Sequence, residues 1–180
     1  MMPVMPNVHR CRRPLEGNKH EPGPLAVKQP AAAIVRASRA SDYTAVRRLL
    51  DDAQLPTADL ASAPGLRCWV LEMHDEVVGV VGLECADRGA LVRSLVVARD
   101  HRGQGWGSEL LVRVEREAGE LGIRQLVLLT ETAQRFFSAH GYAVIDRGRV
   151  PEALQRTAEF RSLCPVSAVC MTKSLETGRD

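Results

Sequence analysis

The sequence predicts an α/β (α+β) domain built on a central mixed, mostly antiparallel sheet of about seven strands with flanking helices. Three observations lead to this prediction. The chain has 180 residues with 45% apolar content, which is enough for one domain with a real core. Three strand-like runs follow one another with only short turns between them, as in an antiparallel meander. An amphipathic helical stretch and an unbroken apolar run come next.

The first 33 residues differ in composition from the rest of the chain. They are rich in proline and polar residues and show no hydrophobic periodicity. The segment also has basic residues but no apolar stretch of the kind that a secretory signal requires. We therefore expect residues 1–33 to be a disordered extension or an over-extended start of translation, and residues 34–176 to form the domain.

The first half of the domain is expected to contain four strands and one or two helices. A strand at Ile34–Ala37 is followed by a helix that starts with a cap at Ser41–Thr44 and stops at Leu55–Pro56. Thr57–Leu60 is a candidate for a second short helix. The meander strands are expected at Cys68–Glu72, Val77–Glu84 and Leu91–Val97.

The second half is expected to begin with a helix at Gly107–Leu121. Its apolar residues recur at helical spacing, so the predicted buried face consists of Leu110, Leu111, Val114, Ala118 and Leu121. The apolar run Gln125–Leu129 is typical of a strand covered on both faces. A short helix at Thr132–Ala139 and strands at Tyr142–Ile145 and Val166–Lys173 complete the predicted order, β-α-β-β-β-α-β-α-β-β.

Composition argues against several classes of function. The formal net charge is only +2, and no basic stripe with interleaved aromatic residues is present, so we expect no nucleic-acid partner. No apolar run approaches the roughly 18 residues of a membrane span. The five cysteines are odd in number and form no Cys-x-x-Cys pair. We therefore expect reduced thiols, a cytoplasmic location and no metal site.

A glycine-rich junction separates the third meander strand from the helix that follows it. Gly103, Gly105 and Gly107 leave the backbone bare directly before a helix N-terminus, where unpaired N–H groups and the helix dipole favour an anion. Arg102 can add a charge-assisted contact. The pattern fits neither a Walker loop nor a Rossmann turn. The junction is thus either a site for a diphosphate-like group or a tight turn with no ligand.

Two elements of the chain resemble a known family, the GCN5-related N-acetyltransferases (GNAT). Arg102-x-x-Gly105-x-Gly107 resembles its acyl-CoA signature, and Thr130-x-x-Ala133-x-x-Phe136-Phe137-x-x-x-Gly141-Tyr142 resembles its second CoA-side element. The resemblance covers Ile34–Lys173. It implies the GNAT fold, in which the strand ending at Val97 splays from the strand ending at Thr130 and acetyl-CoA lies in the gap. The residues expected to bind this co-substrate are Leu95, Val97, Arg102, Gly103, Gln104, Gly105, Trp106, Gly107, Thr130 and Phe137.

Catalysis of acetyl transfer needs a proton acceptor for the amine and stabilisation of the thioester oxygen. A backbone N–H near Leu95 is expected to polarise the thioester carbonyl. Glu84, at the end of a strand, is the candidate base, the alternative being a solvated carboxylate or the partner of a nearby arginine. The chain also departs from the family pattern, because Phe137 stands where a tyrosine often protonates the leaving thiolate and Thr130 replaces the usual asparagine.

Arg93 interrupts an apolar strand, where a guanidinium is costly unless an anion pairs with it. One interpretation is a bidentate grip on a substrate carboxylate. The other is an internal salt bridge, for example with Glu84.

The C-terminal segment bears on the acceptor. The string from Thr157 to Met171 resembles the second subgroup of bacterial arsinothricin N-acetyltransferases, as do Leu55–Leu60 and Leu91–Val97. This resemblance implies a small acidic amino-acid acceptor of the arsinothricin or phosphinothricin type. The alternatives are a glutamate-like metabolite and a CoA-binding sensor without turnover. A homodimer is expected by resemblance alone. The candidate acceptor-pocket residues are Ser94, Thr157, Glu159, Arg161 and Ser162. The alternative is that this connection between strands only packs against the domain and binds no acceptor.

Overall fold

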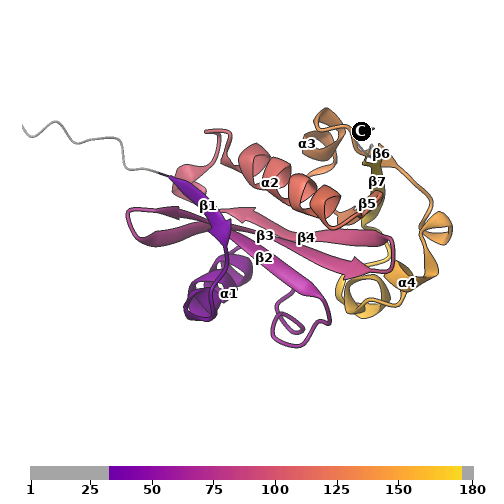
Figure 1. The fold of residues 1–180 in the computed structure, drawn as a ribbon, viewed down its shortest axis with the longest axis horizontal. Helices are drawn as coiled ribbons and strands as arrows, with labels where there is room; N and C mark the ends of the chain where they lie inside the picture. Colours follow the sequence, from indigo (N-terminus) through magenta and orange to yellow (C-terminus); the bar gives the residue numbers. More distant parts are fainter. Residues whose placement is uncertain (1–32, 176–180) are drawn as a thin grey trace, which may run out of the picture. The chain divides into compact units, whose positions relative to one another are not determined.

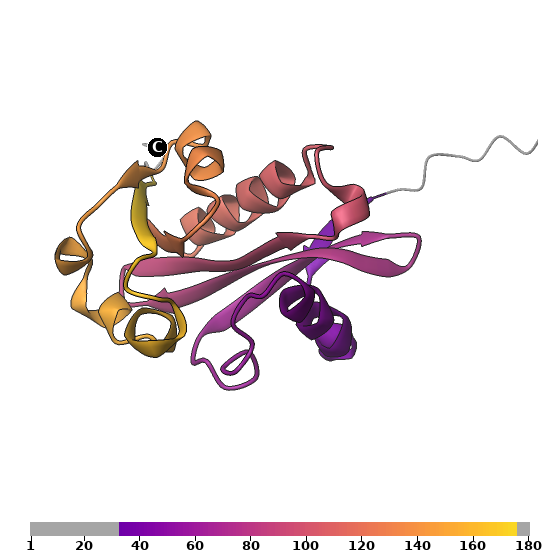
Figure 2. The same cartoon turned by 180° about the vertical axis from the view of Figure 1, so that it is seen from behind.

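A seven-stranded mixed sheet organises the protein in our computed structural model, which describes residues 33–175 (Figures 1 and 2). The strands lie in the order β1-β2-β3-β4-β5-β7-β6, and only β4 and β5 run parallel. This confirms the predicted fold class. The disorder expected of residues 1–33 falls almost entirely outside the described residues. The strands are β1 (Ile34–Ala37), β2 (Leu66–Met73), β3 (Glu76–Ala86), β4 (Gly89–Val97), β5 (Gln125–Thr130), β6 (Ala143–Val144) and β7 (Val169–Ser174).

Helices cover both faces of the sheet (Figure 1). One face carries α1 and the other carries α2, and the segment between β6 and β7 folds into further short helical turns. The helices are α1 (Tyr43–Asp52), α2 (Trp106–Glu120), α3 (Gln134–Ala139) and α4 (Glu152–Gln155). Short 3-10 turns lie at Ala40–Asp42, Arg99–His101 and Arg147–Arg149, and a π-helical turn, η4, lies at Glu159–Leu163.

The long helix α2 presents the predicted apolar face to the sheet. Four of the five expected residues are buried, and each buried leucine or valine contributes about 1.5–3 kcal/mol. Leu121 is the exception and is 42% exposed, because the helix ends at Glu120 and the chain turns away at the cap. On the outer side, Arg113 pairs with Glu117 one turn away, as helical spacing predicts.

The region after β1 differs from the prediction in two respects. Helix α1 ends at Asp52, since Gln54 takes a left-handed backbone conformation with φ +57°. The Asp42 side chain does not cap α1 but pairs with Arg36 of β1. Residues 57–62 form turns instead of a second helix. Pro56 and Pro64 bound this segment, which leaves too few residues to repay helix nucleation.

Strands β4 and β5 splay apart. Their parallel pairing covers only Gly89 to Leu91 of β4, opposite Gln125 to Val127 of β5. Beyond that point β4 stays with β3, while β5 pairs along its whole length with β7. This confirms the predicted gap between the strands that end at Val97 and Thr130.

A bulge in β4 lies beside the gap. The register with β3 shifts between Val80 and Gly82, so that Ser94 and Leu95 together oppose a single residue. Ser94 has φ +58°, an uncommon conformation for a residue other than glycine. The bulge therefore alters the direction of the β4 backbone where the two strands separate.

Three apolar clusters hold the layers together. The largest lies between α2 and the sheet, and the second lies under α1. The third joins Leu91 of β4 and Val127 of β5 to Val150 and Leu154 of the C-terminal segment. This segment therefore covers the place where β4 and β5 separate, on the face opposite α2.

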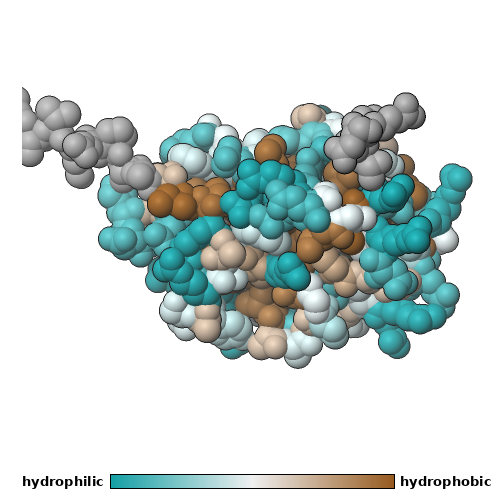
Figure 3. Space-filling view, in the orientation of Figure 1, coloured by the Kyte–Doolittle hydropathy of each residue, from teal (hydrophilic) through white to brown (hydrophobic). Residues whose placement is uncertain are grey.

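The described surface has no extended apolar area in the view of Figure 3, where small apolar patches alternate with hydrophilic side chains. Within residues 33–175, no helix is long and apolar enough to cross a membrane.

Candidate functional site

The junction between β4 and α2 presents a row of backbone N–H groups. From Gly103 to Ser108, none of these groups donates to an acceptor within residues 33–175. Gly103 and Gly105 have φ +75° and +87°, and a Cβ at either would meet no atom within 4 Å. The loop is therefore open to an approaching group, and α2 adds the field of a 15-residue helix. This geometry fits the diphosphate of a coenzyme.

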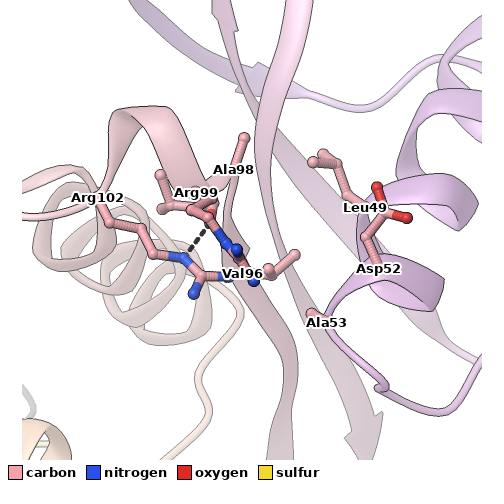
Figure 4. A pocket seen from close by; sticks show the side chains of 8 residues that line it. Leu49, Asp52, Ala53, Val96, Ala98, Arg99 and Arg102 are labelled. Carbon is pink, nitrogen blue, oxygen red and sulfur yellow. Dashed lines mark hydrogen bonds between the residues drawn. The ribbon is translucent and has the colours of Figure 1, made fainter.

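Arg102 fixes this loop to the end of β4. Its Nε donates to the Val97 carbonyl at 2.8 Å, which leaves its two terminal nitrogens free of partners among the described residues. Arg99 and Arg102 lie on one side of a cavity of about 330 Å³, and Leu49 and Asp52 of α1 and the following Ala53 lie on the other (Figure 4). The terminal nitrogens of Arg102 are therefore accessible to an anion, as the prediction requires.

The short helix α3 supports the start of α2. A Cβ at Gly107 would lie 3.6 Å from the Phe136 ring, an ordinary contact distance, so the Phe136 ring packs near the backbone at the start of α2. His140 Nε2 is 2.9 Å from Ser108 Oγ. Phe137 is buried in the core beside Phe136, in the position where the family pattern has a tyrosine. No phenol stands there to protonate a leaving thiolate.

Two further residues expected at the co-substrate site have local partners. Thr130 ends β5 and accepts a hydrogen bond from the Ala133 N–H at 3.0 Å, so its hydroxyl shapes the turn into α3. Trp106 Nε1 donates to Gln104 Oε1 at 3.4 Å across the exposed loop. Both side chains therefore make hydrogen bonds within their own loops.

A buried charge cluster is centred on Arg93 of β4, two residues beyond the last pair between β4 and β5. Arg93 donates to both oxygens of Asp59 at 2.6 Å and to Glu84 Oε2 at 2.9 Å. Its other terminal nitrogen is 2.9 Å from Glu159 Oε2. The Arg93 side chain is only 1% exposed. We call these four residues the Arg93 cluster.

This geometry favours the second of the two interpretations of Arg93, the internal salt bridge. Three carboxylates of the protein surround the guanidinium, and Glu84 is one of them, as that interpretation expected. A substrate carboxylate would have to displace one of them. The cluster brings together Arg93, Glu84 and Glu159, all singled out from the sequence, and adds Asp59, which was not. Asp59 lies 34 residues before Arg93, so only the fold reveals that they meet.

The charges in the cluster do not balance. Burial alone would lower the pKa of Arg93, but its carboxylate partners raise it, so the guanidinium stays charged. One cation faces three carboxyl groups. Burial raises the pKa of Glu159 above its ordinary value, although Arg93 opposes the shift. Cys164 lies beside Glu159. Burial, and to a lesser extent the negative charge of Glu159, raise the pKa of the Cys164 thiol to about 12. Cys164 therefore remains a thiol donor and not a nucleophile.

The remaining candidate pocket residues surround the cluster. Ser94 is buried in the β4 bulge, and Leu95 follows it half-buried. The Thr157 hydroxyl donates to the Leu154 carbonyl and the Ser162 hydroxyl to the Ala158 carbonyl. Arg161 is exposed on η4. The two hydroxyls thus donate to carbonyls of their own segment, whereas the Arg161 side chain faces solvent.

Metal ligands do not gather in the described part of the chain, where no group of three histidine, cysteine or acidic side chains could hold an ion. Cys68, Cys85, Cys164 and Cys170 are free thiols, and Cys11 lies outside the described residues.

Known proteins share both sequence features and the fold. A sequence model of the acetyltransferase (GNAT) domain matches residues 64–144. A GNAT-family acetyltransferase from Staphylococcus aureus Mu50 superposes with a TM-score of 0.68 at 18% identity, covering 81% of this chain and 100% of that one. Rv2747 from Mycobacterium tuberculosis, solved with CoA and NLQ, gives 0.68 at 24% identity over 79% of this chain and 99% of that one.

A third structure is N-acetylglutamate synthase from Neisseria gonorrhoeae with coenzyme A and N-acetyl-glutamate. Its TM-score is 0.70 at 18% identity, over 81% of this chain and 36% of that one. The match at residues 64–144 includes the open junction and the splayed strands. Residues 64–144 thus match the acetyltransferase (GNAT) domain, and the chain shares the fold of acetyltransferases of that family.

Proposed function

We propose that the protein transfers the acetyl group of acetyl-CoA to the α-amino group of a small amino acid. The observation that carries this proposal is the run of unpaired N–H groups from Gly103 to Ser108 beside the splayed end of β4. These amides and Arg102 would hold the diphosphate, and the gap would take the pantetheine arm. Acetyl-CoA supplies an activated acyl group as its thioester.

Strand β4 would orient the thioester. Its segment from the bulge to Val97 has no β5 partner, so its backbone is available to an extended ligand. A backbone N–H near Leu95, aimed at the thioester oxygen, would stabilise the charge that develops there. The carboxylates of the Arg93 cluster, Glu84 among them, are the nearby proton acceptors for the amine.

The finer proposal concerns the acceptor. The resemblance of the C-terminal string favours an arsinothricin- or phosphinothricin-type acid, and glutamate is the second candidate. Similarity to a synthase solved with N-acetyl-glutamate also supports an amino-acid acceptor. Since three carboxylates surround Arg93, another cation would have to hold an acidic head group, and Arg161, which is exposed on η4 two residues after Glu159, is the candidate that the sequence indicated.

An acceptor screen tests this proposal. Purified protein is supplied with acetyl-CoA and one of five amino acids: arsinothricin, phosphinothricin, glutamate, glutamine or lysine. Thiol release and the mass of the product are then followed. We expect N-acetylation with the highest kcat/KM among the three acids. Equal or better turnover of glutamine or lysine would refute the acidic acceptor, and no thiol release with any amine would refute the amino-acid proposal.

A further inference from the structure

The Arg93 cluster contains one carboxyl group more loosely held than the other two. Asp59 receives two hydrogen bonds from the guanidinium, and Glu84 receives one. Glu159 Oε2 lies 2.9 Å from a terminal nitrogen of Arg93, but this ion pair lacks hydrogen-bond geometry, and the oxygen accepts no hydrogen bond within residues 33–175 although the residue is 93% buried. Its other oxygen accepts only from the Cys164 thiol, at 3.5 Å. Buried polar atoms are rarely left without a hydrogen bond, so this oxygen can accept one from a further donor, such as an ammonium group.

The position of Glu159 is as informative as its contacts. It is held by Arg93, two residues beyond Leu91, where the pairing of β4 with β5 ends. The next residue along β4 begins the bulge. Glu159 therefore contacts β4 just beyond the point where β4 and β5 separate, and the proposed function places the thioester and the amine in that separation.

We propose that Glu159 is the catalytic base, accepting a proton from the acceptor ammonium, and that Arg93, Asp59 and Glu84 position it. This inference rests on the proposed function and deepens it. It also assigns the base role to a different carboxylate from the one that the sequence indicated, Glu84, which accepts a hydrogen bond from Arg93.

The proton and electron balance is complete without any other reactant. The ammonium gives one proton to the Glu159 carboxylate, and the freed nitrogen lone pair forms the C–N bond to the thioester carbon. The C–S bond breaks, and its electron pair leaves with the sulfur. The second nitrogen proton neutralises the thiolate, and Glu159 returns its proton to solvent. The products are the amide, the free thiol of CoA and one proton.

The groups that face Glu159 set the direction of its pH dependence. They are Arg93 from β4, Asp59 from the turns after α1, Glu84 from β3 and Cys164 from the C-terminal segment. Burial is the largest influence and favours the protonated form, which raises the pKa. A base works only when deprotonated, so kcat/KM is expected to rise with pH above the range of an ordinary glutamate.

The experiment compares Glu159→Gln with Glu84→Gln, using the best amino acid of the screen. Both changes are nearly isosteric and remove one charge from the cluster. We expect Glu159→Gln to lower kcat about 100-fold and to abolish the rise of kcat/KM at acidic pH, since general bases contribute factors of this size. Glu84→Gln is expected to keep that rise. Calorimetry should show the same affinity for acetyl-CoA in Glu159→Gln and wild type.

The outcomes separate the inference from the proposed function. Two results overturn the inference alone. One is a kcat of Glu159→Gln within threefold of wild type. The other is a rise of kcat/KM at acidic pH that disappears in Glu84→Gln and persists in Glu159→Gln. No turnover by wild type with any amine overturns both. Should Glu159→Gln fail to fold, Glu159→Asp supplies the test, because a shortened base is expected to lower kcat yet keep the acidic rise. An unchanged kcat in Glu159→Asp contradicts the assignment.

Discussion

Replacing Arg93 by methionine is expected to lower the free energy of unfolding by about 3–5 kcal/mol, because it leaves buried carboxylates without their cation. Methionine fills a similar volume, so the loss reports charge and not a cavity. Denaturant unfolding of both proteins measures the difference. We expect it to be largest near pH 8 and to shrink towards pH 5, since burial raises the pKa of Glu159 and its protonation removes part of the repulsion.

A surface arginine provides the matched control. Arg116 pairs with Glu120 on α2, and both side chains are more than half exposed. Arg116→Met is expected to change the free energy of unfolding by no more than about 0.5 kcal/mol, as is usual for exposed pairs. If Arg93→Met loses no more stability than Arg116→Met, the cluster is not the structural anchor that its contacts indicate.

Replacing Gly105 by valine is expected to weaken acetyl-CoA binding by tenfold or more. A β-branched residue at φ +87° is strained by about 1–3 kcal/mol, and its side chain would stand in the open space before the N–H groups. A loss of 1.4 kcal/mol in binding free energy already corresponds to tenfold. Calorimetric titration with acetyl-CoA measures this effect.

Gly119 is the control for this substitution. It lies in α2, the helix that Gly105 precedes. A Cβ at Gly119 would meet nothing within 4 Å, and the backbone there is not left-handed. Gly119→Ala is expected to keep the affinity for acetyl-CoA and to stabilise the fold by about 0.5–1 kcal/mol. Equal affinities of wild type and Gly105→Val would show that the open space at the junction is not used by the ligand.

Local sequence signals were enough to predict most of the framework. The meander, the buried face of α2 and the bare junction at Gly103–Gly107 follow from periodicity, turn residues and glycine spacing, which act over a few neighbouring positions. The predictions were wrong where an element's end or length mattered. Leu121 is exposed because α2 stops one residue earlier, and residues 57–62 remain turns between two prolines.

The buried cluster was only partly accessible from sequence. An arginine in an apolar strand requires an anion, and that argument correctly included an internal partner for Arg93. It did not identify Asp59, because the contact joins a turn after α1 to a central strand. Nor did it distinguish Glu84 from Glu159 as a base, since the guanidinium contacts both and only its contact with Glu84 has hydrogen-bond geometry. Such information exists only after the chain has folded.

The central claim is that the N–H groups from Gly103 to Ser108 bind the diphosphate of acetyl-CoA. Titration of wild type and Gly105→Val with acetyl-CoA and with S-acetyl-pantetheine, which lacks the diphosphate and the adenosine attached to it, tests it most directly. We predict measurable heat with acetyl-CoA and an affinity at least tenfold lower for S-acetyl-pantetheine. Equal affinity for the two, or no heat with acetyl-CoA from a well-folded sample, would contradict the account.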